Sequence, residues 1–389
     1  MIDTVVLNFD IDKFKIKKPY LFRPNAEGFL KTFGQGKAIN NPTKADFLSV
    51  GYTPRMTLYK RPSRMGFMCG LRIEFSVPKI LYKNNLDELK EDNFEEVINI
   101  LQKRLENKGV FINKKNLINA DVSVFHPSKN IELSNYTTAT MVLRDLAKVD
   151  LTKRLDLTKT IFPVNGESLQ YYSNSHSFVF YDKIADMKKS SKRAIDKENN
   201  PFQKSLFAEI REARRFVDVE ILRMEVRLTN KRKMNKILAE CGFKESPKFK
   251  NVFKKEVCQK ILQYYWQKLV LEKNKAIFMK ESNNKQEEMI KFLIQAKKKG
   301  KKQLKALNLW LLSELQRKQG SVLINQIIDD VFGVGSYQSI QKQYRELNEI
   351  IKEPDFEFKN YIKDIEKSLR EFESIKKEQF SDVFNFINN

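Results

Sequence analysis

The sequence predicts an α+β fold: an antiparallel β-sheet with helices on one face, followed by a mostly helical C-terminal part. Two observations predict this class. Runs with strand-like alternation of polar and apolar residues lie before about residue 230, and beyond it apolar residues recur at the helical period. The chain of 389 residues is long enough for two domains. We therefore expect a first domain over residues 1–270 and a helical domain over 271–389.

Five runs in the first part alternate with the two-residue period of half-buried strands. They span residues 4–9, 71–77, 120–125, 177–183 and 219–229. Between the second and third runs, residues 86–108 have apolar side chains at helical spacing and end before a glycine, which predicts a helix. Strands interrupted by a few helices are typical of an α+β domain.

Three segments of the second part have the helical period, at residues 231–242, 249–274 and 286–315. The boundary near residue 270 is placed there because residues 273–285 are polar and weakly periodic. Residues 320–347 read as a helix, a turn with two glycines and a second helix. This pattern suits a DNA-binding helix-turn-helix and equally an ordinary helical hairpin, so we expect a DNA-binding or assembly domain.

The charge of the chain favours a polyanionic partner. There are 72 Lys and Arg residues against 49 Asp and Glu, a formal net charge of +23. A field of this sign attracts nucleic acid. A lysine-rich composition without a specific ligand gives the same balance. No long apolar stretch or signal-like start is evident, so we expect a cytoplasmic protein with no membrane partner.

Cysteine and histidine usage limits the metal chemistry. The isolated thiols Cys69, Cys241 and Cys258 form neither a disulfide framework nor a zinc motif. His126 and His176 are the two histidines of the sequence, and their spacing excludes the usual two-histidine metal motifs. Any metal ion is therefore expected to be held mainly by carboxylates.

Four predicted strands carry charged or reactive side chains on the face opposite their apolar side, because successive strand residues alternate between faces. If the strands share one sheet, these side chains gather on its open face. The residues are Arg72 and Glu74, then Asp121, then Tyr181 and Lys183, and finally Arg223, Glu225 and Arg227.

This set suits phosphodiester transfer. Three carboxylates suit a hard cation such as Mg²⁺ or Mn²⁺. A tyrosine hydroxyl is a poor nucleophile at neutral pH and is activated by a neighbouring cation, a role for which Lys183 is placed. Charged residues facing outward also describe any sheet with one solvated face, so the pattern alone leaves both interpretations open.

Five segments of the sequence resemble the filamentous-phage gene II replication initiator family, in the same order and at similar intervals. The Y-x-K and R-x-E-x-R patterns also resemble those of staphylococcal-type plasmid rolling-circle initiators. The resemblance covers residues 1–240. The segments are MIDTVVL, LRIEFSVPKIL, INADVSVF, SHSFVFYDKIADM and ILRMEVRLTNKRKM.

The resemblance implies a metal-dependent endonuclease that nicks one strand at a phage or plasmid origin and rejoins the displaced strand after rolling-circle synthesis. Tyr181 would form a 5′-phosphotyrosyl intermediate, with Lys183 beside it. The metal ligands would be Glu225, Asp121 and Glu74, and the ion Mg²⁺ or Mn²⁺. Expected partners are duplex and single-stranded origin DNA, with host helicase and polymerase as further candidates.

The sequence departs from better-known rolling-circle initiators because it lacks their paired metal-binding histidines. Arg72, Arg223 and Arg227 are expected either to neutralise the acids or to bind DNA phosphates, and His176 is a weaker candidate for DNA contact. Two alternatives remain: a metal-dependent nuclease without a covalent intermediate, and a non-enzymatic DNA-binding protein of a plasmid or phage.

Overall fold

The computed structural model describes residues 1–64, 66–82, 84–134, 136–151, 156–161, 166–188, 220–352 and 354–376. Its centre is a nine-stranded sheet in which every neighbouring pair is antiparallel. This confirms the predicted α+β class. In spatial order the strands are β3 (Gly36–Asn40), β4 (Arg55–Ser63), β5 (Gly66–Ser76), β1 (Ile2–Asp10), β7 (Asp121–Leu133), β11 (Glu220–Leu228), β10 (His176–Asp182), β9 (Ser168–Tyr172) and β8 (Asp156–Ile161).

From β3 to β9 one face of this sheet is mainly apolar, because directly paired residues point to the same side. Leu7 pairs with Ile73 on β5 and Val122 on β7, and all three are fully buried. Farther along the sheet, Phe178 pairs with Val226 in the same way. The opposite face, called the open face below, carries the polar residues of the same strands.

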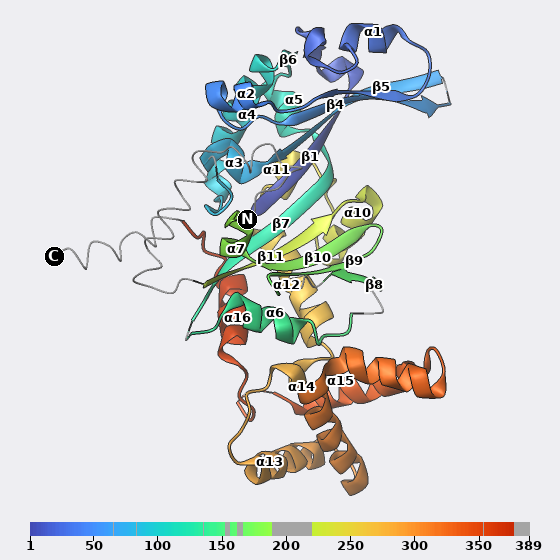
Figure 1. The fold of residues 1–389 in the computed structure, drawn as a ribbon, viewed down its shortest axis with the longest axis vertical. Coiled ribbons are helices and arrows are strands. Elements are labelled where there is room, and N and C mark those ends of the chain that lie inside the picture. Colours follow the sequence, from blue (N-terminus) through green and yellow to red (C-terminus); the bar gives the residue numbers. More distant parts are fainter. Residues whose placement is uncertain are drawn as a thin grey trace, which may run out of the picture.

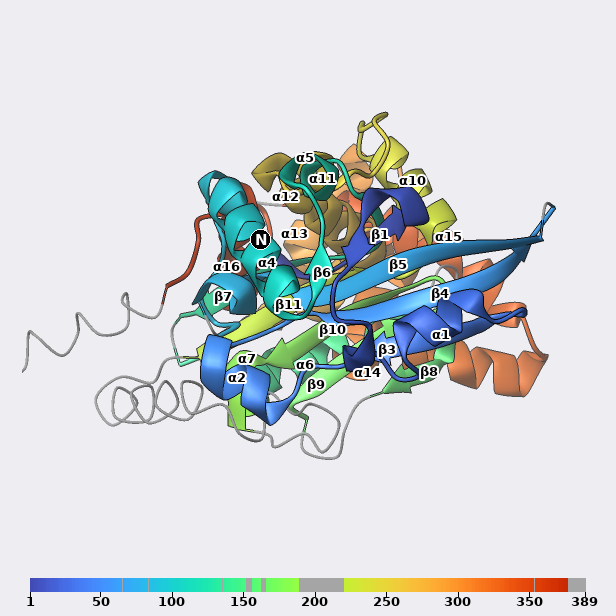
Figure 2. The ribbon, with the colours of Figure 1, turned by 90° about the horizontal axis from the view of Figure 1, so that it is seen from above.

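Helices cover the apolar face. Figure 2 shows α10, α11 and α12 together on one side of the strands. The Phe249 ring of α11 meets Phe75 of β5 edge-on, with ring centres 6.1 Å apart, and Tyr265 of α12 meets Phe178 of β10 at 5.4 Å. The covering helices are α4 (Phe94–Asn107), α6 (Ala139–Leu146), α10 (Lys231–Glu240), α11 (Phe249–Val252) and α12 (Lys255–Tyr265).

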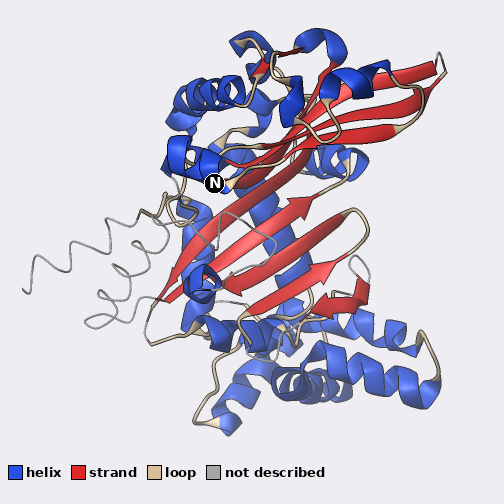
Figure 3. Ribbon diagram, turned by 45° about the horizontal axis from the view of Figure 1, so that its top comes forward, coloured by secondary structure: helices blue, strands red, loops and turns tan. Residues whose placement is uncertain are grey.

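Smaller elements surround this two-layer core (Figure 3). A two-stranded sheet pairs β2 (Lys15–Ile16) with β6 (Val110–Phe111). The short helices are α1 (Ala26–Lys31), α2 (Lys44–Val50), α3 (Val77–Tyr82), α5 (Lys114–Ile118) and α7 (Lys183–Lys188). None of the described helices combines the length and apolar character that crossing a membrane requires.

The C-terminal helices extend one end of the molecule and then return to the sheet (Figure 1). They are α13 (Lys285–Lys298), α14 (Gln303–Phe332), α15 (Gln341–Ile350) and α16 (Asn360–Glu371). Helix α16 packs against β7, and the amides of Gln259 and Gln263 donate hydrogen bonds to the Leu369 carbonyl. Helix α16 belongs to the second predicted domain but packs against β7 of the first. The predicted boundary near residue 270 therefore stays a prediction.

Element boundaries differ from the sequence predictions at several points. The helix expected over 86–108 begins at Phe94. The strand expected to end at Phe125 continues through Pro127 to Leu133, because Pro127 lies at a register shift between β1 and β7, where a missing N–H is tolerated. The helical period over 286–315 belongs to α13 and α14, which are separated at Gly300.

Candidate functional site

Most of the predicted site residues lie on the open face, and those that line a pocket are divided between two pockets. The first, called the tyrosine pocket, has a volume of about 340 Å³ and is lined by Tyr181, Glu225 and Arg227 among others. The second, called the basic trough, has a volume of about 630 Å³ and is lined by Arg72, Glu74 and Asp121 among others. The structure therefore does not bring the three predicted carboxylates together.

Tyr181 and Glu225 lie on the adjacent strands β10 and β11 as a diagonal pair: Tyr181 pairs directly with Arg223, and Glu225 lies two residues farther along β11 on the same face. The Tyr181 hydroxyl donates a hydrogen bond to Oε2 of Glu225 at 3.3 Å. Burial raises the pKa of Tyr181 well above its usual value, and nearby Arg223 opposes that rise. At neutral pH the phenol is therefore protonated, and its oxygen faces the pocket beside an ionised carboxylate.

Glu225 is buried, with its side chain 2% exposed. Nε of Arg227 contacts its Oε1 at 2.7 Å, and Nδ1 of His126 lies 3.4 Å from the same oxygen. Burial alone would raise the pKa of Glu225, but Arg227, His126 and Arg223 outweigh it and hold this pKa well below the usual range. The carboxylate is thus a permanent negative charge at the base of the pocket.

A third acid completes this cluster. Asp3 of β1, His126 of β7 and Glu225 of β11 each place a ligand atom within 4.8 Å of the others. Nε2 of His126 is buried and has no hydrogen-bond partner among the described residues. We call these three residues the Asp-His-Glu cluster.

The cluster fits a divalent cation chemically. Two carboxylates and one imidazole suit Mn²⁺, which takes oxygen and nitrogen donors, better than Mg²⁺, which favours oxygen alone. The buried Nε2 of His126, which has no hydrogen-bond partner among the described residues, is a nitrogen donor of the kind that such an ion binds. In this structure Arg223 and Arg227 neutralise the two carboxylates.

Arg223 anchors the cluster and is not free to grip DNA. Its side chain is 2% exposed, and its NH2 donates to Oδ1 of Asp3 at 2.8 Å and to the hydroxyl of Ser128 at 2.9 Å. Its NH1 donates to the side-chain oxygen of Asn130 and the carbonyl of Asn85. The expectation that Arg223 contacts DNA is therefore wrong for this geometry, because the guanidinium is buried beneath the pocket.

Lys183 does not extend the strand as expected, because β10 ends at Asp182 and α7 begins at Lys183. The lysine nevertheless stays beside the tyrosine, with Nζ 5.7 Å from the centre of the Tyr181 ring. The Lys183 side chain is fully buried. It is positioned to favour negative charge near the phenol and near Asp3, whose pKa it helps to lower.

The remaining predicted acids lie in the basic trough. Asp121 accepts from Nζ of Lys248 at 2.8 Å, and Lys231 lies 3.9 Å away. Arg72 lies 3.8 Å from Glu74. Asp121 and Glu74 are therefore not ligands of the Asp-His-Glu cluster, contrary to the sequence prediction, because the open face holds two pockets rather than one.

His176 lies on the covered face, away from both pockets. Its ring centre is 5.8 Å from that of Tyr265 on α12, and Ser173 contacts its Nδ1 at 2.9 Å. Burial, assisted by Lys233, lowers the pKa of His176 to about 4. The predicted DNA contact through His176 is therefore wrong, because the alternation along β10 places it opposite Tyr181.

Sequence reasoning missed Asp3 and His126. Asp3 reaches the open face only because β1 shifts register against β7 between Ile2 and Val5, so the alternation along the sequence does not reveal it. The predicted strand ends at residue 125, just before His126 and Pro127, whereas β7 continues past both residues. Its position could be found only from the pairing of β7 with β1 and β11.

Comparison with protein-family models, with curated proteins and with solved structures finds no match to this chain. The fold and the site together define a class: a sheet protein with a tyrosine and a possible metal cluster in one pocket of its open face.

Proposed function

We propose that this protein is a DNA-nicking and strand-joining enzyme in which Tyr181 is the nucleophile, as in rolling-circle replication initiators. The observation that carries the proposal is the hydrogen bond of 3.3 Å between the Tyr181 hydroxyl and Glu225, a member of the Asp-His-Glu cluster. The net charge of +23 supports a nucleic acid as the substrate.

The reaction is a transesterification. The Tyr181 oxygen attacks a backbone phosphorus while the bond from phosphorus to the 3′ oxygen breaks, which leaves a 5′-phosphotyrosyl link and a 3′-hydroxyl. The phenolic proton leaves to solvent in the pocket, because Glu225 stays ionised and only orients the phenol through its hydrogen bond, and the 3′ oxygen takes up a proton from solvent. The reverse attack by a 3′-hydroxyl rejoins a strand and restores the phenol.

Each neighbouring residue has a distinct task in this proposal. Arg223 and Lys183 favour the phenolate electrostatically. Arg227 holds Glu225 ionised and lines the pocket where the phosphate would lie. A divalent ion at the Asp-His-Glu cluster would supply charge stabilisation for the phosphoryl oxygens.

The direct test uses supercoiled plasmid and pooled single-stranded oligonucleotides, incubated with the protein and Mn²⁺. We expect a protein–DNA adduct that survives denaturation and maps to the peptide containing Tyr181. Tyr181→Phe should abolish the adduct, because it removes only the hydroxyl group, which is the proposed nucleophile. Tyr20→Phe, at an exposed tyrosine in an early turn, is the matched control and should leave it unchanged.

Two results would contradict the proposal. Cleavage without an adduct would indicate a metal-dependent nuclease that uses water, and an adduct that persists in Tyr181→Phe would assign another nucleophile. No cleavage above background with Mn²⁺ would favour a DNA-binding protein without enzymatic activity.

The metal site has a separate test. Mn²⁺ binding to the pure protein is measured as the loss of the electron paramagnetic resonance signal of the free ion. The affinity should fall about 10- to 100-fold in His126→Ala and in Glu225→Gln. Glu74→Gln is the control, because Glu74 lies in the basic trough. Equal weakening by Glu74→Gln, or no weakening by His126→Ala, would remove the Asp-His-Glu cluster as the metal site.

A further inference from the structure

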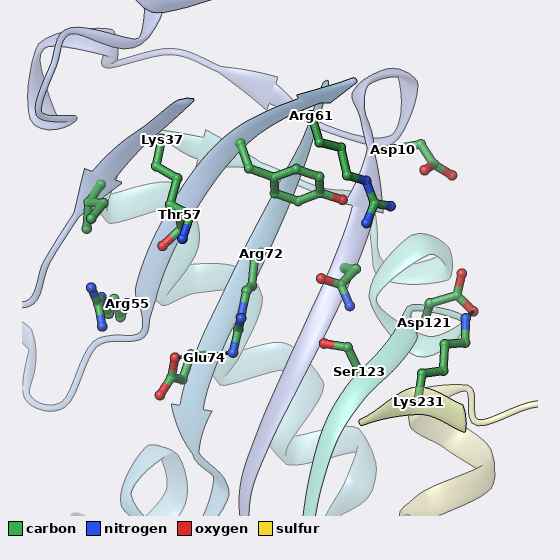
Figure 4. Close-up of a pocket in the computed structure, with 13 residues that line it drawn as sticks. Asp10, Lys37, Arg55, Thr57, Arg61, Arg72, Glu74, Asp121, Ser123 and Lys231 are labelled. Carbon is green, nitrogen blue, oxygen red and sulfur yellow. Dashed lines mark ion pairs between the residues drawn. The ribbon is translucent and has the colours of Figure 1, made fainter. Parts of the chain in front are cut away.

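The basic trough has more positive charge than its acids neutralise. Five basic residues line it from four elements, against three acids. Figure 4 shows them along β3, β4 and β5, with Asp121 and Lys231 together at the far side. The basic residues are Lys37, Arg55, Arg61, Arg72 and Lys231, and the acids are Asp10, Glu74 and Asp121.

Each of the three acids already has a basic neighbour. Asp10 accepts from Lys13 at 2.8 Å, Asp121 accepts from Lys248, and Glu74 faces Arg72. In the described part of the chain no carboxylate forms an ion pair with the remaining three cations, Lys37, Arg55 and Arg61. These three side chains are exposed along two adjacent strands, and their positive charge on the open face is not neutralised by an acid.

The trough also contains a flat aromatic surface. Tyr59 of β4 pairs directly with Gly70 of β5, and its ring lies across that glycine: a Cβ at position 70 would be 2.5 Å from the Tyr59 hydroxyl. The guanidinium of Arg61 lies over the same ring, 5.4 Å from its centre. Glycine at position 70 therefore lets the ring lie on the sheet and support Arg61.

This trough lies next to the tyrosine pocket along two strands. Along β5, Arg72 and Glu74 line the trough, and Ser76, the next residue on the same face, lines the tyrosine pocket. Along β1, Asn8 lines the trough and Thr4 the tyrosine pocket. From Arg72 to Ser76 the strand advances about 13 Å, a distance that a short extended oligonucleotide spans.

We propose that the basic trough binds single-stranded DNA, with a base stacked on the Tyr59–Arg61 pair and backbone phosphates on Lys37 and Arg55. The inference rests on the proposed function for the identity of the strand, which is the one whose phosphate reacts at Tyr181. An aromatic surface beside unpaired cations is the combination that single-stranded DNA recognises through base stacking and phosphate contact. Duplex DNA keeps its bases stacked on each other and leaves none for Tyr59.

The test measures binding of a fluorescein-labelled oligothymidylate of about twenty nucleotides by fluorescence anisotropy. Tyr181→Phe protein in EDTA is used throughout, so that neither cleavage nor a metal ion contributes. Tyr59→Ala should weaken binding about tenfold or more, whereas Tyr59→Phe keeps the ring and should bind like the parent. Gly70→Ala should also weaken binding, because the added methyl meets both the Tyr59 ring and the backbone carbonyl of Phe9 and displaces the ring.

Salt dependence separates the cations from the ring. Lys37→Ala and Arg55→Ala should each reduce the slope of log affinity against log salt by about 0.7. Lys103→Ala, an exposed lysine on α4 over the covered face, is the control and should leave the slope unchanged.

The inference would be overturned if Tyr59→Ala and Arg55→Ala each bound the oligonucleotide as tightly as the parent. It would also be overturned if a duplex of the same length competed for binding as well as the single strand. The adduct experiment is independent of this one. If the trough variants lose binding but the parent forms no adduct, the trough is supported and the nicking function is refuted. If the parent forms the adduct but the trough variants bind normally, the nicking function is supported and the trough is refuted.

Discussion

Glu225 shows how a buried acid in this protein depends on its basic neighbours. Its carboxylate and that of Asp3 carry two negative charges, and Arg223 and Arg227 carry two positive charges beside them. Removing any one of these groups leaves an unpaired charge in a poorly solvated site. This lowers the free energy of unfolding far more than the loss of an exposed ion pair does.

Arg223→Ala should therefore lower the free energy of unfolding by about 3–5 kcal/mol. It leaves Asp3 and Glu225 without their shared partner and leaves the hydroxyl and amide acceptors around the guanidinium unpaired. Urea denaturation followed by circular dichroism measures the change. Arg72→Ala, at a half-exposed arginine, is the control and should change stability by less than about 1 kcal/mol. Equal effects of the two substitutions would contradict an anchoring role for Arg223.

At the residue scale, strand alternation was enough to predict that Tyr181 and Glu225 share the open face. It was not enough to predict which acids stand beside them. Glu74 and Asp121 have the same alternation as Glu225, yet they lie in the other pocket, because position along a strand depends on register and not on periodicity. Asp3 joins Glu225 through β1 and β7, a pairing that no local pattern reveals.

At the scale of elements, helix α14 contains a break at Gly320, which has φ of 80° and ψ of 161°. The backbone of Lys148 passes so close to this glycine that a Cβ there would collide with it. The amide of Ser321 donates to the Lys148 carbonyl at 2.9 Å, so the break joins α14 to the segment that follows α6. Only glycine satisfies both the positive φ and the close approach.

Gly320→Ala should destabilise the protein by about 1–3 kcal/mol, since alanine neither adopts this backbone conformation easily nor fits against Lys148. Gly28→Ala in helix α1 is the matched control: a Cβ at Gly28 meets nothing within 4 Å. That control should be neutral or should stabilise by up to about 1 kcal/mol, as alanine favours helices. Thermal unfolding of both variants measures the difference, and a neutral Gly320→Ala would mean that the break is not required.

The sequence was informative about elements where the pattern was long. All five predicted strands coincide with observed ones, and the helical character beyond residue 230 is confirmed. Strands β3 and β4 escaped prediction because their open-face residues, among them Arg55 and Thr57, line the basic trough while polar residues such as Lys60 also lie on the buried side. Lys60 donates to the carbonyls of Leu30 and Thr32, a long-range pairing that interrupts apolar alternation.

At the scale of the whole molecule, the buried acid Glu88 ties distant parts of the chain together. Its Oε2 lies 2.5 Å from Nζ of Lys129 on β7 and accepts from the amide of Ile375 at 3.1 Å. Lys129 in turn donates to the carbonyl of Glu373. One carboxylate thus joins the loop before α4, the centre of the sheet and the segment that follows α16.

This network gives the protein a defined response to acid. Burial would raise the pKa of Glu88, but Lys129 and the hydrogen bonds outweigh it and lower this pKa to about 2 from the usual 4.5. The folded state therefore gains stability from Glu88 above pH 4.5 and loses it as the pH falls towards 2. The corresponding contribution is about 3 kcal/mol at neutral pH.

Glu88→Gln should remove that contribution. The difference in free energy of unfolding between variant and parent should be largest near pH 7 and should shrink between pH 4.5 and 2, as measured by urea denaturation across that range. Glu27→Gln, at an exposed acid of α1, is the control: its ion pair with Lys31 also lowers the pKa of Glu27, but solvent screens this exposed pair, so the pH profile should change far less than in Glu88→Gln. A pH-independent difference would show that Glu88 acts through packing and not through its charge.

Strand β7 begins beside the basic trough at Asp121 and reaches His126 of the Asp-His-Glu cluster, with register shifts against β1 along the way. From Asp121 to Ser128 the chain advances seven steps, at most about 23 Å, and β1 and β11 hydrogen-bond to it on both sides. The strand therefore sets the spacing between the two sites. Any polymer that occupies both sites meets them at that one interval.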